Sequence, residues 1–161
     1  GHSCPPRTMK KDADKVILLV EDNEDDVLIT QWALQSAGVK NPLHIVRDGQ
    51  EAVDYLSGTL QFADRQKFPF PGLVLLDLKL PYRSGLEILE WMRAQSSLPT
   101  TVVAVLTSSN EPKDLQRAYA LGAKTYLVKP PTAQMIHDIA EGFNLDWLGR
   151  NPALNAETMD T

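Results

Sequence analysis

The sequence predicts an α/β fold in which a parallel sheet is covered by helices on both faces. Short apolar runs bounded by turn residues alternate along the chain with longer segments of helical period. The runs are rich in Val, Ile and Leu, as expected of strands that are buried on both sides. Polar residues follow the ends of four runs, which is where open sheets of this class bind ligands. These observations favour a chain of βα units with a ligand site at one edge of the sheet.

Five strands and five helices are expected in strict alternation. The strands are expected at residues 15–20, 43–46, 73–77, 101–106 and 125–128, and the helices at 24–37, 49–57, 85–95, 112–121 and 133–147. The buried face of the last helix is the clearest, because the apolar residues Ile136, Ile139, Phe143 and Trp147 recur at steps of three and four.

The length and composition of the chain limit its possible functions. Its 161 residues, 43% hydrophobic and 23% charged, suffice for one buried core. We expect one domain over residues 15–148, between a disordered leader or expression remnant (1–14) and a flexible tail (149–161). Apolar runs of at most five residues predict no membrane span, and a net charge of -5 argues against nucleic-acid binding. The single cysteine, Cys4, allows neither an intrachain disulfide nor a thiolate metal cluster, which fits a cytoplasmic protein.

Four strand ends carry polar residues of complementary chemistry. Glu21 and Asp22 follow the first strand, Asp77 ends the third, Thr107 follows the fourth and Lys129 follows the fifth. Carboxylates gathered at one edge repel each other unless a cation compensates, and hard oxygen ligands suit Mg²⁺, for which Mn²⁺ can substitute. The lysine could contact Asp77 or the oxygens of a transferred phosphoryl group. Because phosphoryl transfer rests on positioning and charge neutralisation, such a site needs no general base, and Asp77 would be the nucleophile.

Each of these residues also has a purely structural explanation. Glu21 and Asp22 could be an acidic helix start favoured by the helix dipole. The hydroxyl residues after the fourth strand could cap the next helix, and Lys129 could be an ordinary loop lysine. Asp77 is harder to explain in this way, because a carboxylate at the end of an apolar strand is costly to bury without a partner. The occurrence of all of them, each after its own strand, favours a functional site.

Four segments resemble the motifs of a known family. They are VILLVEDNEDD, LVLLDLKLPYRSGLEIL, VVAVLTSS and AKTYLVKP, and they resemble the acidic pair, phosphoacceptor block, switch hydroxyl and lysine signature of the response-regulator receiver domains of two-component signalling. The resemblance covers roughly residues 15–147. It implies a flavodoxin-like (βα)5 fold with a five-stranded parallel sheet of order 2-1-3-4-5.

The resemblance implies a role for each residue at the acidic edge. Asp77 would accept a phosphoryl group from the phosphohistidine of a sensor histidine kinase. Asp22 would be a direct Mg²⁺ ligand and Glu21 would act largely through water. The main-chain carbonyl of Lys79 would complete the protein ligands.

The resemblance also implies how the phosphoryl group is bound and sensed. Thr107 and Lys129 would bind its oxygens. Tyr126 would be an aromatic switch that turns inward when Thr107 moves, with a half-buried strand tyrosine as the alternative. The peptide bond between Lys129 and Pro130 would be cis.

Two further segments resemble the regulators that are paired with bacterial phytochrome-type kinases. One is the aromatic-rich loop at residues 58–71, where we expect the phenylalanines, Phe62, Phe68 and Phe70, to form a local apolar plug, with partner contact as the alternative. The other is the segment FNLDWLG at the end of the last helix, where Phe143 and Trp147 would either pack in the core or cover the sheet edge or a neighbouring subunit.

Lys79 separates this interpretation from its competitors. A haloacid-dehalogenase-like phosphatase would need a second aspartate at that position, two residues after the nucleophile. A flavodoxin-like electron carrier would need a glycine- and hydroxyl-rich phosphate loop where this chain has EDNEDD. The side chain of Lys79 could contact the acidic cluster or the phosphoryl group and alter phosphoryl lifetime, or simply be solvated.

We therefore expect a signalling protein rather than an enzyme, with intrinsic self-phosphorylation and autodephosphorylation. A receiver-like interaction module that takes no phosphate is the alternative. Phosphorylation would change the face formed by the fourth helix, fifth strand and fifth helix, which could bind a partner or a second copy of the chain.

Overall fold

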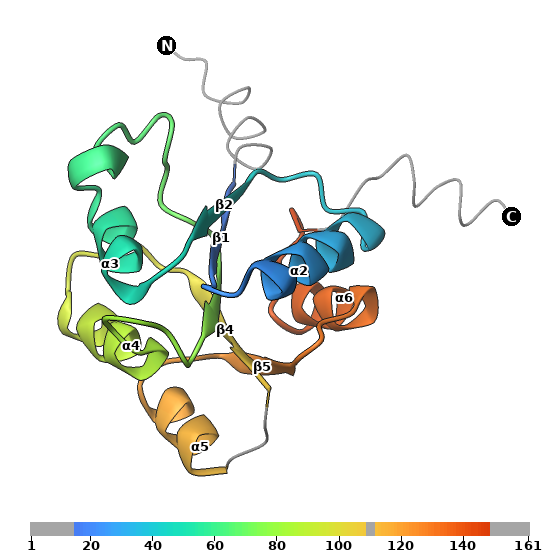
Figure 1. The fold of residues 1–161 in the computed structure, drawn as a ribbon. Helices are drawn as coiled ribbons and strands as arrows, with labels where there is room; N and C mark the ends of the chain where they lie inside the picture. The colour runs from blue at the N-terminus through green and yellow to red at the C-terminus, as the bar shows by residue number, and fades with distance from the viewer. Residues whose placement is uncertain (1–14, 109–111, 149–161) are drawn as a thin grey trace, which may run out of the picture.

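A computed structural model describes residues 15–108 and 112–148 of the chain. The five strands form one parallel sheet of order β2-β1-β3-β4-β5, which confirms the predicted class and strand order (Figure 1). The strands are β1 (Ile17–Val20), β2 (Leu43–Val46), β3 (Leu73–Asp77), β4 (Val102–Thr107) and β5 (Thr125–Val128). The helices are α2 (Glu24–Ser36), α3 (Gly49–Ser57), α4 (Gly85–Ala94), α5 (Pro112–Ala120) and α6 (Ala133–Gly142), with a short 3₁₀ helix η1 (Leu60–Phe62). The predicted leader and tail lie outside the described residues, as does Ser109, one of the hydroxyl residues that follow the fourth predicted strand.

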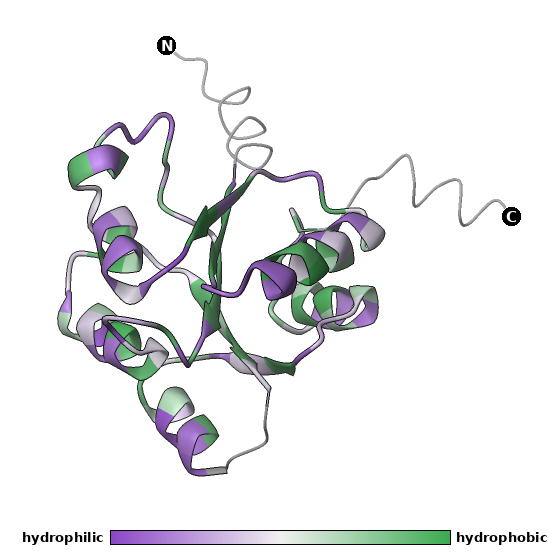
Figure 2. Ribbon diagram, viewed as in Figure 1, coloured by the Kyte–Doolittle hydropathy of each residue, from purple (hydrophilic) through white to green (hydrophobic). Residues whose placement is uncertain are grey.

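The helices form a layer on each face of the sheet, with α2 and α6 on one side and α3, α4 and α5 on the other (Figure 1). Alternate strand residues enter alternate cores. Leu18 and Val20 of β1 pack in the cluster with α3 and α4, whereas Ile17 and Leu19 pack in the cluster with α2 and α6. Figure 2 shows the hydrophobic strands between helices of mixed hydropathy, and Leu28, Ile29 and Trp32 of α2 are exposed apolar residues. Both faces of the sheet are therefore buried, as the apolar strand runs predicted.

The strand register brings the carboxyl ends of the strands to one rim. Val20 of β1 pairs with Leu76 of β3, so the next residues, Glu21 and Asp77, emerge at the same level. Asp77 in turn pairs with Leu106 of β4. Thr107, the next residue, pairs with Val128 of β5, directly before Lys129. Residues from four strand ends thus meet because the strands are parallel and in this register.

The last helix is shorter than predicted. It ends at Gly142 rather than at residue 147, because Asn144 adopts a left-handed conformation with φ 56°. The amide of Leu145 donates to the carbonyl of Ala140, and that of Asn144 to Glu141, a pattern that closes a helix end. Phe143 and Trp147 still pack against the cluster under α2 and α6, so the interpretation of these two residues as core packing is confirmed.

The loop before β3 is a compact apolar plug, as predicted. The rings of Phe62 and Phe68 lie 5.2 Å apart edge to face, and Tyr55 of α3 packs against both. Phe70 packs against the same core cluster. The guanidinium of Arg65 donates to the main-chain carbonyls of Tyr55, Leu56 and Phe68 at 2.8 to 2.9 Å. The plug therefore belongs to the core rather than to the rim that carries Asp77.

The predicted bounds of β2, β3, β5 and α3 are confirmed, and, apart from the end of α6, those of the other elements differ from the observed ones by at most two residues. The largest consequence is at β4, which includes Thr107 as its last residue instead of ending before it. Among the described residues, no helix has the length and apolar character that crossing a membrane requires.

Candidate functional site

An acidic trio lies at the rim formed by the ends of β1 and β3. Glu21, Asp22 and Asp77 each offer a carboxylate oxygen within 4.8 Å of the others. Glu21 is fully buried and Asp77 is 6% exposed, whereas Asp22 is exposed to solvent. Three predicted residues are thus brought together, with one of them open to an incoming ligand.

Lys129 reaches this trio from the end of β5. Its Nζ lies 2.9 Å from Oε1 of Glu21 and 3.0 Å from Oδ2 of Asp77. The peptide bond between Lys129 and Pro130 is cis, as the sequence resemblance implied. The main-chain amide of Lys129 donates to the carbonyl of Thr107 at 2.8 Å, so β4 and β5 hold the lysine in place.

A further carboxylate, that of Asp26, completes the surroundings of Lys129 and was missed by the sequence analysis. Its Oδ2 lies 2.9 Å from the lysine Nζ. Asp26 is in the first turn of α2, where the side chain of Asn23 caps the helix by accepting from the Asp26 amide at 3.0 Å. An acidic first turn is common because of the helix dipole, so the sequence gave no reason to separate Asp26 from Glu24 and Asp25.

Burial and charge act in opposite directions on the two central groups. Burial raises the pKa of Glu21 to about 7, and nearby Asp77 adds to the rise while Lys129 and the Asn23 amide oppose it. Burial alone would lower the pKa of Lys129, but its three carboxylate partners raise that pKa above its ordinary value. Lys129 is therefore charged at neutral pH, and Glu21 takes up a proton at a higher pH than an ordinary glutamate does.

One oxygen of the trio is not fully satisfied. Oε1 of Glu21 is buried and forms no hydrogen bond of good geometry, although the Lys129 ammonium lies 2.9 Å away as an ion-pair partner. Buried carboxylate oxygens of this kind are costly unless they are paired or bind a cation. The donor set, three carboxylates with one exposed to water, suits a hard divalent ion that keeps several water ligands.

Thr107 and Tyr126 lie on the α5 side of the sheet. Val103 and Val105 of β4 pack in the cluster on that side, and Thr107 follows at the same two-residue period. Tyr126 pairs with Val105 on the neighbouring strand and is 39% exposed. Its ring meets that of Tyr119 of α5 edge to face. The structure therefore places the two predicted switch residues on adjacent strands with the tyrosine outward.

Lys79 contributes its main chain rather than its side chain. Its amide donates to Oδ1 of Asp77 at 3.0 Å, which fixes the orientation of that carboxylate. The side chain is exposed and forms no ion pair with any residue in 15–108 or 112–148. Its predicted effect on phosphoryl lifetime, and the ligand role of its carbonyl, stay predictions.

Comparison with known proteins decides the family. Residues 17–141 match the model of the response regulator receiver domain, which is most of the chain. The chain belongs to the response regulator receiver family. Receivers are signalling proteins, and this assignment removes the phosphatase and electron-carrier alternatives.

The proteins similar to this receiver include a cyanobacterial response regulator and two proteins named as bacteriophytochrome response regulators. The response regulator Rcp1 of Synechocystis sp. is 34% identical over 134 residues, covering 83% of this chain and 89% of Rcp1. Among solved structures, the bacteriophytochrome response regulator AtBRR is 38% identical with a TM-score of 0.73, covering 82% of this chain and 94% of its own. RtBRR, of the same description, is 39% identical with a TM-score of 0.71 and corresponding coverages of 82% and 78%.

One of these relatives has been solved with a divalent metal. The structure of the Mn²⁺-bound form of Rcp1 is similar to this receiver with a TM-score of 0.66 and 34% identity, covering 83% of this chain and 94% of that one. The acidic trio of the present receiver offers oxygen ligands of the kind that such an ion prefers.

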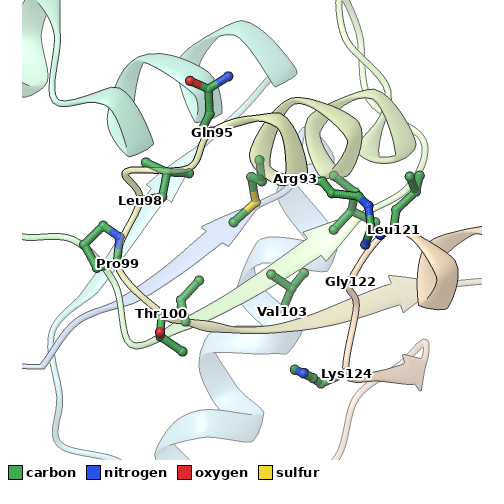
Figure 3. Close-up of a pocket in the computed structure, with 12 residues that line it drawn as sticks. Arg93, Gln95, Leu98, Pro99, Thr100, Val103, Leu121, Gly122 and Lys124 are labelled. Atoms are coloured by element: carbon green, nitrogen blue, oxygen red, sulfur yellow. The ribbon is translucent and has the colours of Figure 1, made fainter.

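A separate hollow lies far from this chemistry. It has a volume of about 300 Å³ and lies between α4, the start of β4 and the turn before β5 (Figure 3). Arg93 and Lys124 are its charged lining residues, and none of its lining residues is a carboxylate, histidine or cysteine. Because it is at the amino ends of the strands, the hollow is not part of the acidic site of the receiver.

Proposed function

We propose that this receiver accepts a phosphoryl group on Asp77 from the phosphohistidine of a sensor histidine kinase. The observation that carries the proposal is the pairing of Asp77 with Lys129 at 3.0 Å inside an acidic trio. A buried aspartate can act as the nucleophile in phosphoryl transfer. The adjacent Lys129 ammonium can then bind the oxygens of the phosphoryl group on the aspartate.

Four residues have distinct roles in the proposed phosphoryl transfer. A carboxylate oxygen of Asp77 forms the new bond to phosphorus while the bond from phosphorus to the histidine nitrogen breaks. The Lys79 amide holds the Asp77 carboxylate by its Oδ1, which leaves its rotation restricted. Lys129 stabilises the negative charge on the transferred group, and Thr107 donates a hydrogen bond to one of its oxygens.

Glu21, Asp22 and Asp77 would hold a divalent cation, Mg²⁺ with Mn²⁺ as a substitute. The ion neutralises charge on the phosphoryl oxygens when it is bound. The carbonyl of Lys79 is the further protein ligand that we propose, with water supplying the rest.

We infer that the output is a change of surface. Movement of Thr107 toward the phosphoryl group would free space for Tyr126 to turn inward, which changes the face formed by α5, β5 and α6. That face could bind a partner protein or a second copy of the chain. Analytical ultracentrifugation with and without a phosphoryl mimic tests the dimer, and unchanged mass would exclude it.

The names of RtBRR and AtBRR, both bacteriophytochrome response regulators, support a phytochrome-type kinase as the donor. A phosphate-independent interaction module is the second candidate, and a phosphorylation assay separates it from the proposed function. The protein is incubated with acetyl phosphate and Mg²⁺, and its intact mass is measured beside that of Asp77→Asn. A labile phosphoryl adduct on the wild type alone supports the proposal, whereas no adduct on the wild type contradicts it.

A further inference from the structure

The ammonium of Lys129 has more partners than the phosphoryl-transfer site needs. An ammonium has three N–H donors, and three carboxylates surround this one: Glu21 at 2.9 Å, Asp26 at 2.9 Å and Asp77 at 3.0 Å. Only two of these acids, Glu21 and Asp77, also belong to the trio that offers oxygens to a cation. Asp26 is the partner that the lysine does not share with the metal.

We propose that Asp26 is a positioning residue that keeps the Lys129 ammonium at the rim while a divalent ion occupies the trio. The inference rests on the proposed function and adds a residue to it. A dication at Glu21 and Asp77 repels the ammonium and competes with it for the same oxygens. Asp26 then supplies a negative charge that the dication does not take, so the lysine remains within reach of the phosphoryl group.

The structure gives Asp26 the fixed position that this role requires. Its amide is held by the Asn23 side chain at the start of α2, and the Asn23 amide in turn donates to Oε2 of Glu21 at 3.2 Å. The side chain of Asp26 is 31% exposed, compared with 14% for Lys129. The ion pair is therefore partly shielded from water and is screened less than a surface pair.

Loss of Asp26 would change two measurable properties. Without Asp26, the Lys129 ammonium has only Glu21 and Asp77 as partners. A cation that binds these two carboxylates must then displace the ammonium completely. We expect Asp26→Asn to raise the half-saturating Mg²⁺ concentration by about threefold or more. We also expect the maximal rate of phosphorylation by acetyl phosphate to fall by about tenfold, because the lysine is no longer held in place.

Asp25 provides a matched control. It lies one residue before Asp26 in the same turn, is exposed, and forms no ion pair with any residue that the structure describes. Asp25→Asn removes the same charge from the same first turn of α2. Any general effect of net charge on Mg²⁺ binding will therefore appear in both variants, and only the contact with Lys129 differs.

The experiment measures Mg²⁺ affinity by isothermal titration calorimetry and phosphorylation by intact mass. It compares the wild type, Asp25→Asn, Asp26→Asn, Asp26→Glu and Lys129→Gln, as well as Lys129→Gln combined with either Asp25→Asn or Asp26→Asn. Asp26→Glu retains the charge and should recover part of both properties. In the Lys129→Gln background, Asp26→Asn should change Mg²⁺ affinity no more than Asp25→Asn does. Urea unfolding without metal confirms that each variant folds and should show that Asp26 and Lys129 are coupled.

Equal behaviour of Asp26→Asn and Asp25→Asn would overturn the inference, as would an Asp26→Asn effect on Mg²⁺ that persists without Lys129. These outcomes differ from a failure of the proposed function, in which the wild type itself takes no phosphoryl group. In that case the calorimetric and unfolding measurements still decide whether Asp26 tethers the lysine.

Discussion

The rings of Tyr119 and Tyr126 meet edge to face with their centroids 6.4 Å apart and their planes at 81°. The contact joins α5 to β5 and leaves both rings in partial contact with solvent, at 44% and 39% exposure. An inward turn of Tyr126 would break it. The pair therefore reports on the switch that we propose, independently of any output partner.

We expect Tyr126 to become protected when the receiver is activated. Hydroxyl-radical footprinting with and without beryllium fluoride measures the oxidation of each ring, and Tyr126 should lose most of its reactivity as its ring turns toward Thr107. Trp32 on α2 is 71% exposed and lies on the other face of the sheet, so its oxidation should stay constant. Unchanged Tyr126 reactivity in the activated protein would show that the ring does not turn inward.

Gly85 should tolerate no side chain, because α4 begins against the phosphoacceptor strand. A Cβ at this position would lie 2.5 Å from the main-chain oxygen of Asp77 and 2.7 Å from Cα of Leu78. We expect Gly85→Ala to reduce the free energy of unfolding by about 2 kcal/mol. It should also slow phosphorylation, because the Asp77 main chain must shift.

Gly142 offers the matched control for that substitution. It is also in a helix, at the end of α6, and a Cβ there would meet nothing within 4 Å. Gly142→Ala should leave phosphorylation unchanged and stabilise the protein slightly, since alanine favours helix. Equal effects of the two substitutions on the free energy of unfolding would show that crowding against Asp77 does not cause the destabilisation by Gly85→Ala.

The fold and the central site residues could be predicted because they depend on local pattern. Apolar runs specify buried parallel strands, and parallel strands in register bring Glu21, Asp77 and Lys129 to one rim. Asp26 could not be found in this way. Its role depends on a contact with Lys129, 103 residues away along the chain, and its position in an acidic helix start gives it an ordinary explanation.

The end of α6 shows a second limit of sequence patterns. Phe143 and Trp147 continue the helical spacing, which predicted a helix to residue 147. The structure keeps both side chains against the core while the backbone turns at Asn144. Apolar spacing records which side chains are buried, and a chain can bury them with a helix end as well as with a helix.

Arg65 should stabilise the apolar plug without affecting the phosphorylation site. Its guanidinium satisfies three main-chain carbonyls at the opposite rim from Asp77. We expect Arg65→Met to reduce the free energy of unfolding by about 2 kcal/mol, since charged hydrogen bonds to partly buried carbonyls are lost. Lys67→Met, an exposed neighbour in the same loop, should have little effect. A similar loss of stability in both variants would indicate a general effect of loop charge.

Binding of Mg²⁺ should depend on pH through Glu21. The pKa of this buried group is raised from 4.5 to about 7, so below about pH 7 a cation must displace a proton from it. The half-saturating Mg²⁺ concentration should rise as pH falls through 7, and calorimetry in two buffers of different ionisation enthalpy should detect proton release. The stability of the metal-free protein should depend on pH in the opposite direction from its affinity for Mg²⁺. The folded state retains a proton that the unfolded state loses, so stability should fall as pH rises from 4.5 to 7.

Glu21→Gln isolates this group from the other acids of the rim. The variant should bind Mg²⁺ more weakly and without proton release near pH 7, and its metal-free stability should fall less than that of the wild type as pH rises from 4.5 to 7. Glu24→Gln is the control, since Glu24 is exposed and pairs with Arg47 outside the trio. If proton release persists in Glu21→Gln, another group must carry the linkage, and the acidic rim would bind the ion with Glu21 already ionised.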